Sequence, residues 1–145
     1  MNVLQYDNLN WKHLTGGDEF DYPISYWGAV LSVRDDGHAD LLYRWDPDSY
    51  CHFHRHVCAI SSVVLAGELH ITDFVDGKPT ETRVRKAGHF SQSSDQHVHM
   101  ERGGPEGALV LFNLYAPDDR LVEQLADDGS VITTRTLSAL LAANR

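Results

Sequence analysis

Three Asp-Gly pairs, at positions 36–37, 76–77 and 128–129, divide the chain into segments of the length of strands and hairpins. An Asp-Gly pair flanked by strand-like residues favours the tight turn of a β-hairpin, because both residues tolerate a positive φ. The segments between the pairs are rich in β-branched and aromatic residues. We predict strands at residues 28–33, 41–45, 51–56, 61–65, 69–75, 80–85, 97–101, 108–115, 121–125 and 130–134. Strands separated by about 8–12 residues are typical of an antiparallel sandwich or barrel.

One segment near the C-terminus has a helical pattern. Thr136 is placed to cap a short helix that runs to Ala143, and Leu137, Leu140 and Leu141 then share one face. The chain contains no Pro/Ser-rich linker and no internal repeat. We therefore expect a single domain over residues 1–145, with an N-terminal arm at 1–25 and the helix within 135–145.

Composition and charge exclude several classes of function. The formal net charge of −9 argues against binding to nucleic acid and against docking on anionic lipid. No apolar run approaches the roughly 18–20 residues that span a bilayer, and the first residues do not have the pattern of a signal peptide. The chain has two cysteines, too few for a disulfide framework, so we expect a reduced, cytoplasmic location.

Histidines are abundant and clustered. Of the nine, five fall in two short segments, at positions 52, 54, 56, 97 and 99. Alternate residues of a strand share one face and lie about 6–7 Å apart at Cα. Two histidines of one strand can therefore occupy adjacent corners of a metal site, and a third can come from another strand. The alternative is a solvated sheet face on which the histidines do nothing.

Imidazole is a borderline ligand that suits Fe, Zn, Cu and Ni. Three neutral imidazoles leave the charge of a divalent ion uncompensated and leave coordination positions open. An anionic oxygen of a substrate is favoured at such a position, and O₂ can bind at another if the ion is Fe(II). Cys58 competes as a ligand, but no second thiol lies at C-x-x-C spacing.

The two histidine segments resemble the two motifs of the cupin superfamily. His54, His56 and Gly67 match the first motif from its first histidine onward, and Val64-Leu65-Ala66-Gly67-Glu68 resembles the turn that ends it. Gly88 and His99 match the second motif. The resemblance implies an all-β, cupin-like antiparallel β-barrel or jelly roll with a short C-terminal helix.

The departures from the cupin motifs concern the ligand set. Ile60 stands where the first motif has a glutamate, and Asp48 stands where it has its opening glycine. Ser94, Gln96 and Gly103 replace the Pro, Gly and Asn of the second motif. The resemblance therefore implies a three-histidine metal site made of His54, His56 and His99, without an acidic fourth partner. The implied ion is Fe(II), with Zn, Ni or Mn as alternatives.

A three-histidine cupin site is similar to that of the acetylacetone-cleaving and dihydroxyacetophenone dioxygenases. This resemblance implies an O₂-dependent enzyme that cleaves a C–C bond of a small β-diketone or of a hydroxyketone or phenolic substrate. It also implies a homo-oligomer, either a dimer or a tetramer. Two alternatives stay open: a non-redox metal-dependent isomerase, lyase or hydrolase, and a cupin that binds a small molecule without catalysis.

Other residues are assigned roles around the predicted ion. Glu101 and His97 are predicted as catalytic residues, since Glu101 has the parity of His99 and could act as a base or hold a water molecule. A solvated rim carboxylate is the alternative for Glu101. His52 and His97 could also be a fourth ligand or orient the site. Ile60, Phe112 and Cys58 are predicted to contact the substrate, with a buried structural role as the alternative for Cys58.

Overall fold

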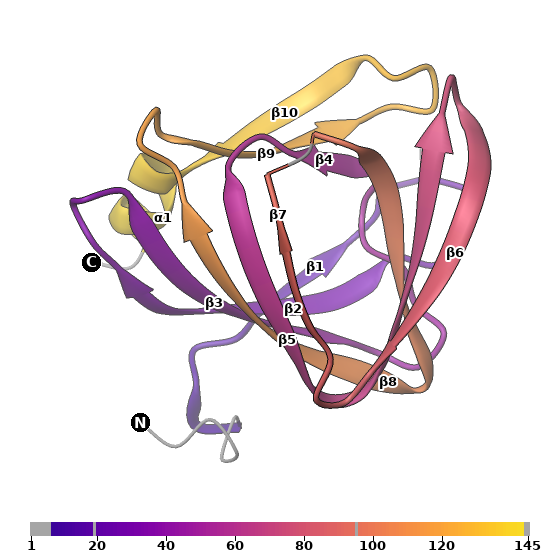
Figure 1. Cartoon of the computed structure of the whole chain (residues 1–145), viewed down its shortest axis with the longest axis horizontal. Helices are drawn as coiled ribbons and strands as arrows, with labels where there is room; N and C mark the ends of the chain where they lie inside the picture. Colours follow the sequence, from indigo (N-terminus) through magenta and orange to yellow (C-terminus); the bar gives the residue numbers. More distant parts are fainter. Residues whose placement is uncertain (1–6, 19, 95, 144–145) are drawn as a thin grey trace.

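The chain folds into one curled antiparallel sheet that wraps around its own interior (Figure 1). The structure is a computed structural model, and it describes residues 7–18, 20–94 and 96–143. Its elements are β1 (Lys12–Thr15), β2 (Ser25–Val33), β3 (His38–Trp45), β4 (His54–His56), β5 (Ala59–Val75), β6 (Lys78–Lys86), β7 (Phe90–Ser93), β8 (Val98–Tyr115), β9 (Arg120–Leu125), β10 (Val131–Thr136) and α1 (Leu137–Ala143). The order along the sheet is β1-β2-β3-β8-β4-β9-β10, and β5 adds β6 and β7 by pairing with β8.

The three Asp-Gly pairs lie at hairpin turns, as predicted. They connect β2 to β3, β5 to β6, and β9 to β10. Gly37, Gly77 and Gly129 have φ angles of 95°, 73° and 83°, and Asp76 has a φ of 50°. These left-handed conformations are those that the turn residues were expected to tolerate. The all-β class and the short C-terminal helix are confirmed.

Two pairs of predicted strands are each one long, bent strand. The segments at 61–65 and 69–75 are both part of β5, and the segments at 97–101 and 108–115 are both part of β8. The ladder between β5 and β8 is interrupted by register shifts instead of turns, on either side of Ala66–Gly67. Gly67 has a φ of 71°, and a Cβ there would lie 2.2 Å from the carbonyl oxygen of Gly107. Only glycine allows the two backbones to approach so closely at this bend.

The strand boundaries differ from the prediction at three places. Within the segment at 51–56, only β4 is a regular strand. Outside β4, the N–H of Cys51 donates to Glu101 O and the carbonyl of Phe53 accepts from Leu125 N–H, without a continuous ladder. β1 lies within the expected N-terminal arm, and β7 was not predicted. Residues 1–6 and 19 of that arm, and residues 144–145 of the helical segment, lie outside the described residues. Within the described part of the chain, no helix is long and apolar enough to cross a membrane.

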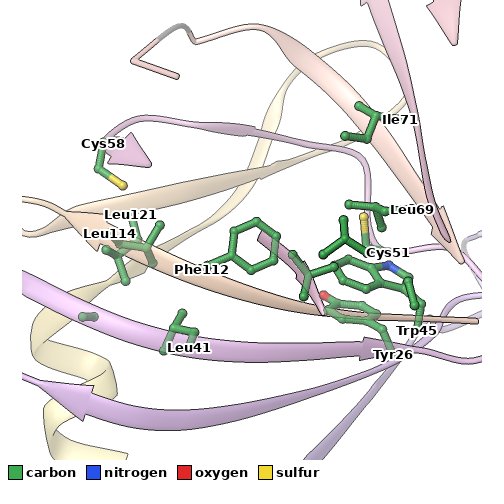
Figure 2. Close-up of a cluster of buried hydrophobic side chains, with 14 of the residues drawn as sticks. Tyr26, Leu41, Trp45, Cys51, Cys58, Leu69, Ile71, Phe112, Leu114 and Leu121 are labelled. Carbon is green, nitrogen blue, oxygen red and sulfur yellow. The ribbon is translucent and has the colours of Figure 1, made fainter. Parts of the chain in front are cut away.

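A hydrophobic cluster fills the inside of the curled sheet (Figure 2). Phe112 is 5% exposed and lies among residues of several strands, including Leu41 and Trp45 of β3. Helix α1 adds Leu137 to this cluster. The Thr136 hydroxyl accepts a hydrogen bond from the N–H of Ala139 at 3.2 Å, which confirms the predicted cap.

Candidate metal centre

Strand β4 brings the first two histidines to the middle of the sheet. β4 is three residues long and lies between β8 and β9, so its side chains are fixed from both sides. His54 is paired with His99 of β8 in the antiparallel ladder. Residues paired in this way lie within about 5.5 Å at Cα. The pairing therefore joins the two histidine segments, which are far apart along the sequence.

Backbone carbonyl groups orient two of the three imidazoles. His54 Nδ1 lies 2.6 Å from the carbonyl oxygen of His52, and His99 Nδ1 lies 3.1 Å from that of His97. A proton on each Nδ1 satisfies these contacts and leaves the lone pair on Nε2 for a metal ion. A bond of this kind is how proteins fix the tautomer of a ligating histidine.

Glu101 lies with the three histidines. It follows His99 by two residues on β8, so both side chains point to the same face. Its side chain is buried, with Oε2 3.7 Å from His54 Nε2 and Oε1 3.8 Å from His99 Nε2. Cys51 Sγ approaches the same carboxylate at 3.8 Å. The carboxylate is thus enclosed by the site and is not on a solvated rim.

The four donor groups have the size of a mononuclear metal site. One ligand atom from each of His54, His56, His99 and Glu101 lies within 4.8 Å of the others. His54 Nε2 and His56 Nε2 are 3.3 Å apart. Donors bound to one ion at about 2.1 Å are about 3.0 Å apart when adjacent and about 4.2 Å when opposite. Small shifts of the side chains would therefore close the group around one ion, and the residues fit a divalent metal.

Burial favours the protonation states that a metal ion needs from the histidines. Desolvation, followed by the neighbouring His54, lowers the pKa of His56 well below its usual value. The pKa of His99 is also well below its usual value. Desolvation is the largest cause, followed by the neighbouring His54 and His56. Both imidazoles are therefore neutral at pH 7. Desolvation raises the pKa of Glu101, so the protein holds its negative charge at a cost that a bound cation would relieve.

The structure adds an acidic side chain to the three histidines that the resemblance implied. The glutamate missing at Ile60 of β5 is matched by a glutamate on a different strand, Glu101 of β8. Neither His52 nor His97 belongs to the group of four potential ligands. The His52 ring instead lies 3.0 Å from the hydroxyl of Tyr26, and His97 is exposed immediately before β8. Both residues also place a backbone carbonyl oxygen against a ligand histidine, which side-chain patterns do not reveal, and both line a cavity beside the centre.

Two cavities meet at these four groups. The first, of about 250 Å³, is mainly apolar and extends toward Tyr26, Leu41 and Leu114. The second, of about 260 Å³, is mainly polar and extends toward β6 and β7. His54 lines the first cavity and His99 lines the second. The residues that line both are His56, Ile60, Glu101 and Phe112.

Of the three residues predicted to contact the substrate, two line the cavities and one does not. Ile60 and Phe112 lie at the wall between the two cavities. Cys58 is not among the described residues that line either cavity, and it packs in the hydrophobic cluster with Leu114 and Leu121 (Figure 2). Cys51, which had no predicted role, does line the apolar cavity. The position of Cys58 fits the alternative of a buried structural residue.

Comparison with known proteins identifies the fold. No family model and no curated protein matches the sequence. A provisionally assigned acetylacetone dioxygenase from Methylibium petroleiphilum superimposes with a TM-score of 0.70 and 16% identity, over 99% of this chain and 93% of that one. An acetylacetone dioxygenase from Acinetobacter johnsonii gives 0.68 and 12%, over 90% and 83% of the two chains. A cupin 2 conserved barrel protein from Rhodopseudomonas palustris gives 0.66 and 12%, over 84% and 81%.

These likenesses show that the chain has the cupin fold, the jelly roll that its two motifs predicted. The group of three histidines and one glutamate lies where those motifs meet. The chain is thus a cupin-fold protein with a set of side chains suited to a metal ion. The identities of 12% to 16% establish the fold and not the reaction.

Proposed function

We propose that this protein is a metal-dependent dioxygenase that cleaves a C–C bond in a small β-diketone, hydroxyketone or phenolic substrate. The observation that carries the proposal is the convergence of His54, His56, His99 and Glu101 beside a mainly apolar cavity. Support also comes from the two superimposed acetylacetone dioxygenases, one of which covers almost the whole chain.

The four residues would hold the ion through the Nε2 atoms of the histidines and one oxygen of Glu101. When Fe(II) is bound there, it supplies a site where substrate oxygens and O₂ come together and electrons pass between them. The net charge of the four ligands favours binding of an anionic substrate to the ion. Three neutral imidazoles and one carboxylate leave a divalent ion with one uncompensated positive charge, which an enolate-like substrate would neutralise.

Glu101 has a second role in this proposal. Its two oxygens face different histidines, at 3.7 Å from His54 and 3.8 Å from His99, so one oxygen can bind the ion while the other stays available. The available oxygen would accept the proton that a diketone loses when it binds as its enolate.

The apolar cavity would bind the hydrocarbon part of the substrate. Phe112 and Ile60 border the four ligating groups, and Leu41 and Leu114 line the space beyond them. Such walls exclude water, and electrostatic interactions are stronger where water is excluded. His97 lines the polar cavity, so its side chain would face the substrate from that side, while its carbonyl group contacts His99.

Reconstitution with single metals tests the proposal. We expect the metal-free protein loaded anaerobically with Fe(II) to consume O₂ when 2,4-pentanedione or a phenolic ketone is added. Protein loaded with Zn, Ni or Mn should not consume O₂. Each preparation should bind one ion per chain. An Fe(II)-loaded protein that binds these compounds without O₂ uptake would overturn the dioxygenase assignment.

The buried carboxylate also favours a second candidate, a non-redox enzyme of the isomerase, lyase or hydrolase type. A Zn, Ni or Mn ion could act there as a Lewis acid while Glu101 moves a proton. The same metal series distinguishes the two candidates. Conversion of a diketone or hydroxyketone under nitrogen by the Zn-, Ni- or Mn-loaded protein would favour this one.

A further inference from the structure

The polar cavity contains two arginines that the proposed reaction has not used. Arg83 and Arg85 both lie on β6, two residues apart, so they project to the same face. Their partners on β5 are Ile71 and Leu69. This pairing places both guanidinium groups in the cavity that His56, His99 and Glu101 close at its other side.

The two arginines differ in their partners. Arg83 Nη2 is bonded to the carboxylate of Asp73 at 2.8 Å. Arg83 Nε is buried and donates to no acceptor among the described residues. Arg85 Nη1 donates to the hydroxyl of Ser91 at 2.7 Å, and none of the described carboxylates lies within ion-pair distance of it. The cavity therefore has one paired and one unpaired guanidinium group.

The charges in the cavity leave room for one negative group. Among the arginine and aspartate side chains that line it, Arg83 and Arg85 carry two positive charges and Asp73 carries one negative charge, so these three leave one positive charge. Glu101 belongs to the ligand group and is offset by the ion. Burial, and then the like charge of Arg83, lowers the pKa of Arg85 without neutralising it, so a nearby anion would be favourable. A dianionic group would exceed this charge.

We propose that the polar cavity binds a carboxylate group of the substrate, with Arg85 as its principal partner. The inference rests on the proposed function, because it takes the ligand group as the place where the rest of the substrate binds. It narrows the substrate to a small diketone or hydroxyketone that carries a carboxylate. The carboxylate points toward β6 and β7, and the hydrocarbon part points into the apolar cavity.

Arg85 and Ser91 have the geometry for this role. A guanidinium group presents paired N–H donors that match the two oxygens of a carboxylate. Ser91 lies 3.0 Å from Ser62, and the hydroxyl pair lines the same cavity. A substrate carboxylate bonded to Arg85 could also be reached by the Ser91 hydroxyl. Polar groups on β5, β6 and β7 would thus surround it.

A matched pair of probes tests the inference: 2,4-dioxopentanoate and its methyl ester share the diketone and differ in the negative charge. Their dissociation constants are measured by calorimetry on Zn-loaded protein, which holds the probe without turnover. We expect the acid to bind more tightly than the ester. Arg85→Gln should weaken binding of the acid by about 10- to 150-fold, the usual effect of losing a hydrogen bond to a charged group. Binding of the ester should be almost unchanged.

Two further variants separate recognition from folding. Arg85→Lys keeps the charge and should retain part of the preference for the acid. Arg34→Gln removes an exposed arginine that lines neither cavity, and should leave both constants unchanged. Melting temperature and bound Zn are measured for every variant. As competitors, acetate should displace the acid from Arg85-containing protein more effectively than inorganic phosphate.

The outcomes are distinct. If the acid has no advantage over the ester, or if Arg85→Gln leaves that advantage intact, the inference is wrong. Arg85→Gln could instead lower the amount of bound Zn and leave unchanged the ratio of the dissociation constants of the acid and the ester. Arg85 would then support Glu101 in the metal site and would not bind the substrate, and the inference is again wrong. Stronger competition by phosphate would overturn the choice of a carboxylate. An acid preference that depends on Arg85, together with no O₂ uptake by the Fe(II) form, would support the subsite and reject only the dioxygenase.

Discussion

The two sides of the candidate metal centre differ sharply in chemistry. On the side of β2, β3 and α1, hydrocarbon and aromatic side chains line the cavity; on the side of β6 and β7, arginines, serines and Asp73 do. His54 lines the apolar side, His99 lines the polar side, and His56 and Glu101 line both. A single ion held by these residues would therefore contact two unlike environments.

If the proposed function holds, this difference would let one fold both exclude water from a reaction and recognise a charge. The apolar side strengthens electrostatic interactions by keeping water away. The polar side can bind an anionic group without burying an unpaired charge, because the arginines are already there. Ile60 and Phe112 are the apolar residues that line both cavities, and replacing Phe112 should have the largest effect.

Phe112→Ala should destabilise the protein and join the two cavities. Phe112 is 5% exposed and packs against Tyr43 and Trp45, so we expect a loss of about 3–5 kcal/mol in the free energy of unfolding. Urea denaturation measures this loss. Phe90→Ala is the control, since Phe90 is 63% exposed and its replacement should change stability by less than about 0.5 kcal/mol. A loss below 1 kcal/mol for Phe112→Ala would show that the wall is not a packed part of the core.

The sequence predicted much of this arrangement because the relevant signals are local. Alternation along a strand and the spacing of the cupin motifs were enough to select His54, His56 and His99. The Asp-Gly pairs located three hairpins, since a tight turn depends on the two residues that form it. Glu101 was also selected by its parity with His99, although as a catalytic residue and not as a ligand. The resemblance placed the usual acidic ligand at Ile60 instead.

What could not be predicted depends on distant contacts. The Gly- and Pro-containing segment at 103–107 has the composition of a turn, yet it is a bulge inside β8 opposite Glu68, with its glycines packed against β3 and β5. The polar cavity depends on the register that places Arg85 opposite Leu69. Such a register follows from the whole ladder and not from the residues of β6 alone. The orienting carbonyl groups of His52 and His97 are equally invisible to side-chain patterns.

His54→Ala and His99→Ala test whether the ion contacts both sides. Structural zinc sites gain about 10–16 kcal/mol from four ligands, so losing one should weaken metal binding by about 100- to 1,000-fold. We expect similar losses for the two variants, although His54 and His99 line different cavities. Competition with a chelator measures the affinity. His97→Ala, which removes an exposed ring but keeps the carbonyl group, should bind metal as the original protein does.

A large loss for one histidine variant and none for the other would place the ion on one side of the wall. The group of four ligands would then be wrong, and the two cavities would have to be treated as separate sites.

Glu101→Gln should have opposite effects on the metal-bound and the metal-free protein. It removes the negative charge between the two cavities, and we expect metal affinity to fall by about 10- to 100-fold, since an amide oxygen is a poorer ligand than a carboxylate. In the metal-free protein at pH 7 the melting temperature should rise, because desolvation disfavours the Glu101 carboxylate. Chelator competition and thermal denaturation measure the two effects. An unchanged metal affinity would restore the three-histidine site that the motifs implied.

Replacing Ile60 by glutamate in the same background sharpens this test. The double variant Ile60→Glu/Glu101→Gln moves the carboxylate to the position that the cupin motif uses, at the wall between the cavities. We expect it to recover part of the metal affinity lost in Glu101→Gln. A double variant that binds metal no better than Glu101→Gln would indicate that only β8 can present a carboxylate to the three histidines.

The smallest expected effect is the pH dependence of stability in the metal-free protein. Burial holds the pKa values of His56 and His99 below their value of about 6.5 in the unfolded chain. Below pH 6.5 the unfolded chain therefore binds protons that the folded chain does not, and stability falls as the pH decreases. Each histidine contributes a slope of at most about 1.4 kcal/mol per pH unit. Glu101, with a raised pKa, acts in the opposite direction above its unfolded value of about 4.5.

Urea denaturation between pH 5 and pH 8 measures the net result. We expect the free energy of unfolding to rise from pH 5 to pH 7 and then to level off. His99→Gln should reduce the slope by the contribution of one histidine on the polar side. A flat profile in the original protein would mean that water reaches these imidazoles from the polar cavity. The two sides of the centre would then differ in their lining residues but not in their access to solvent.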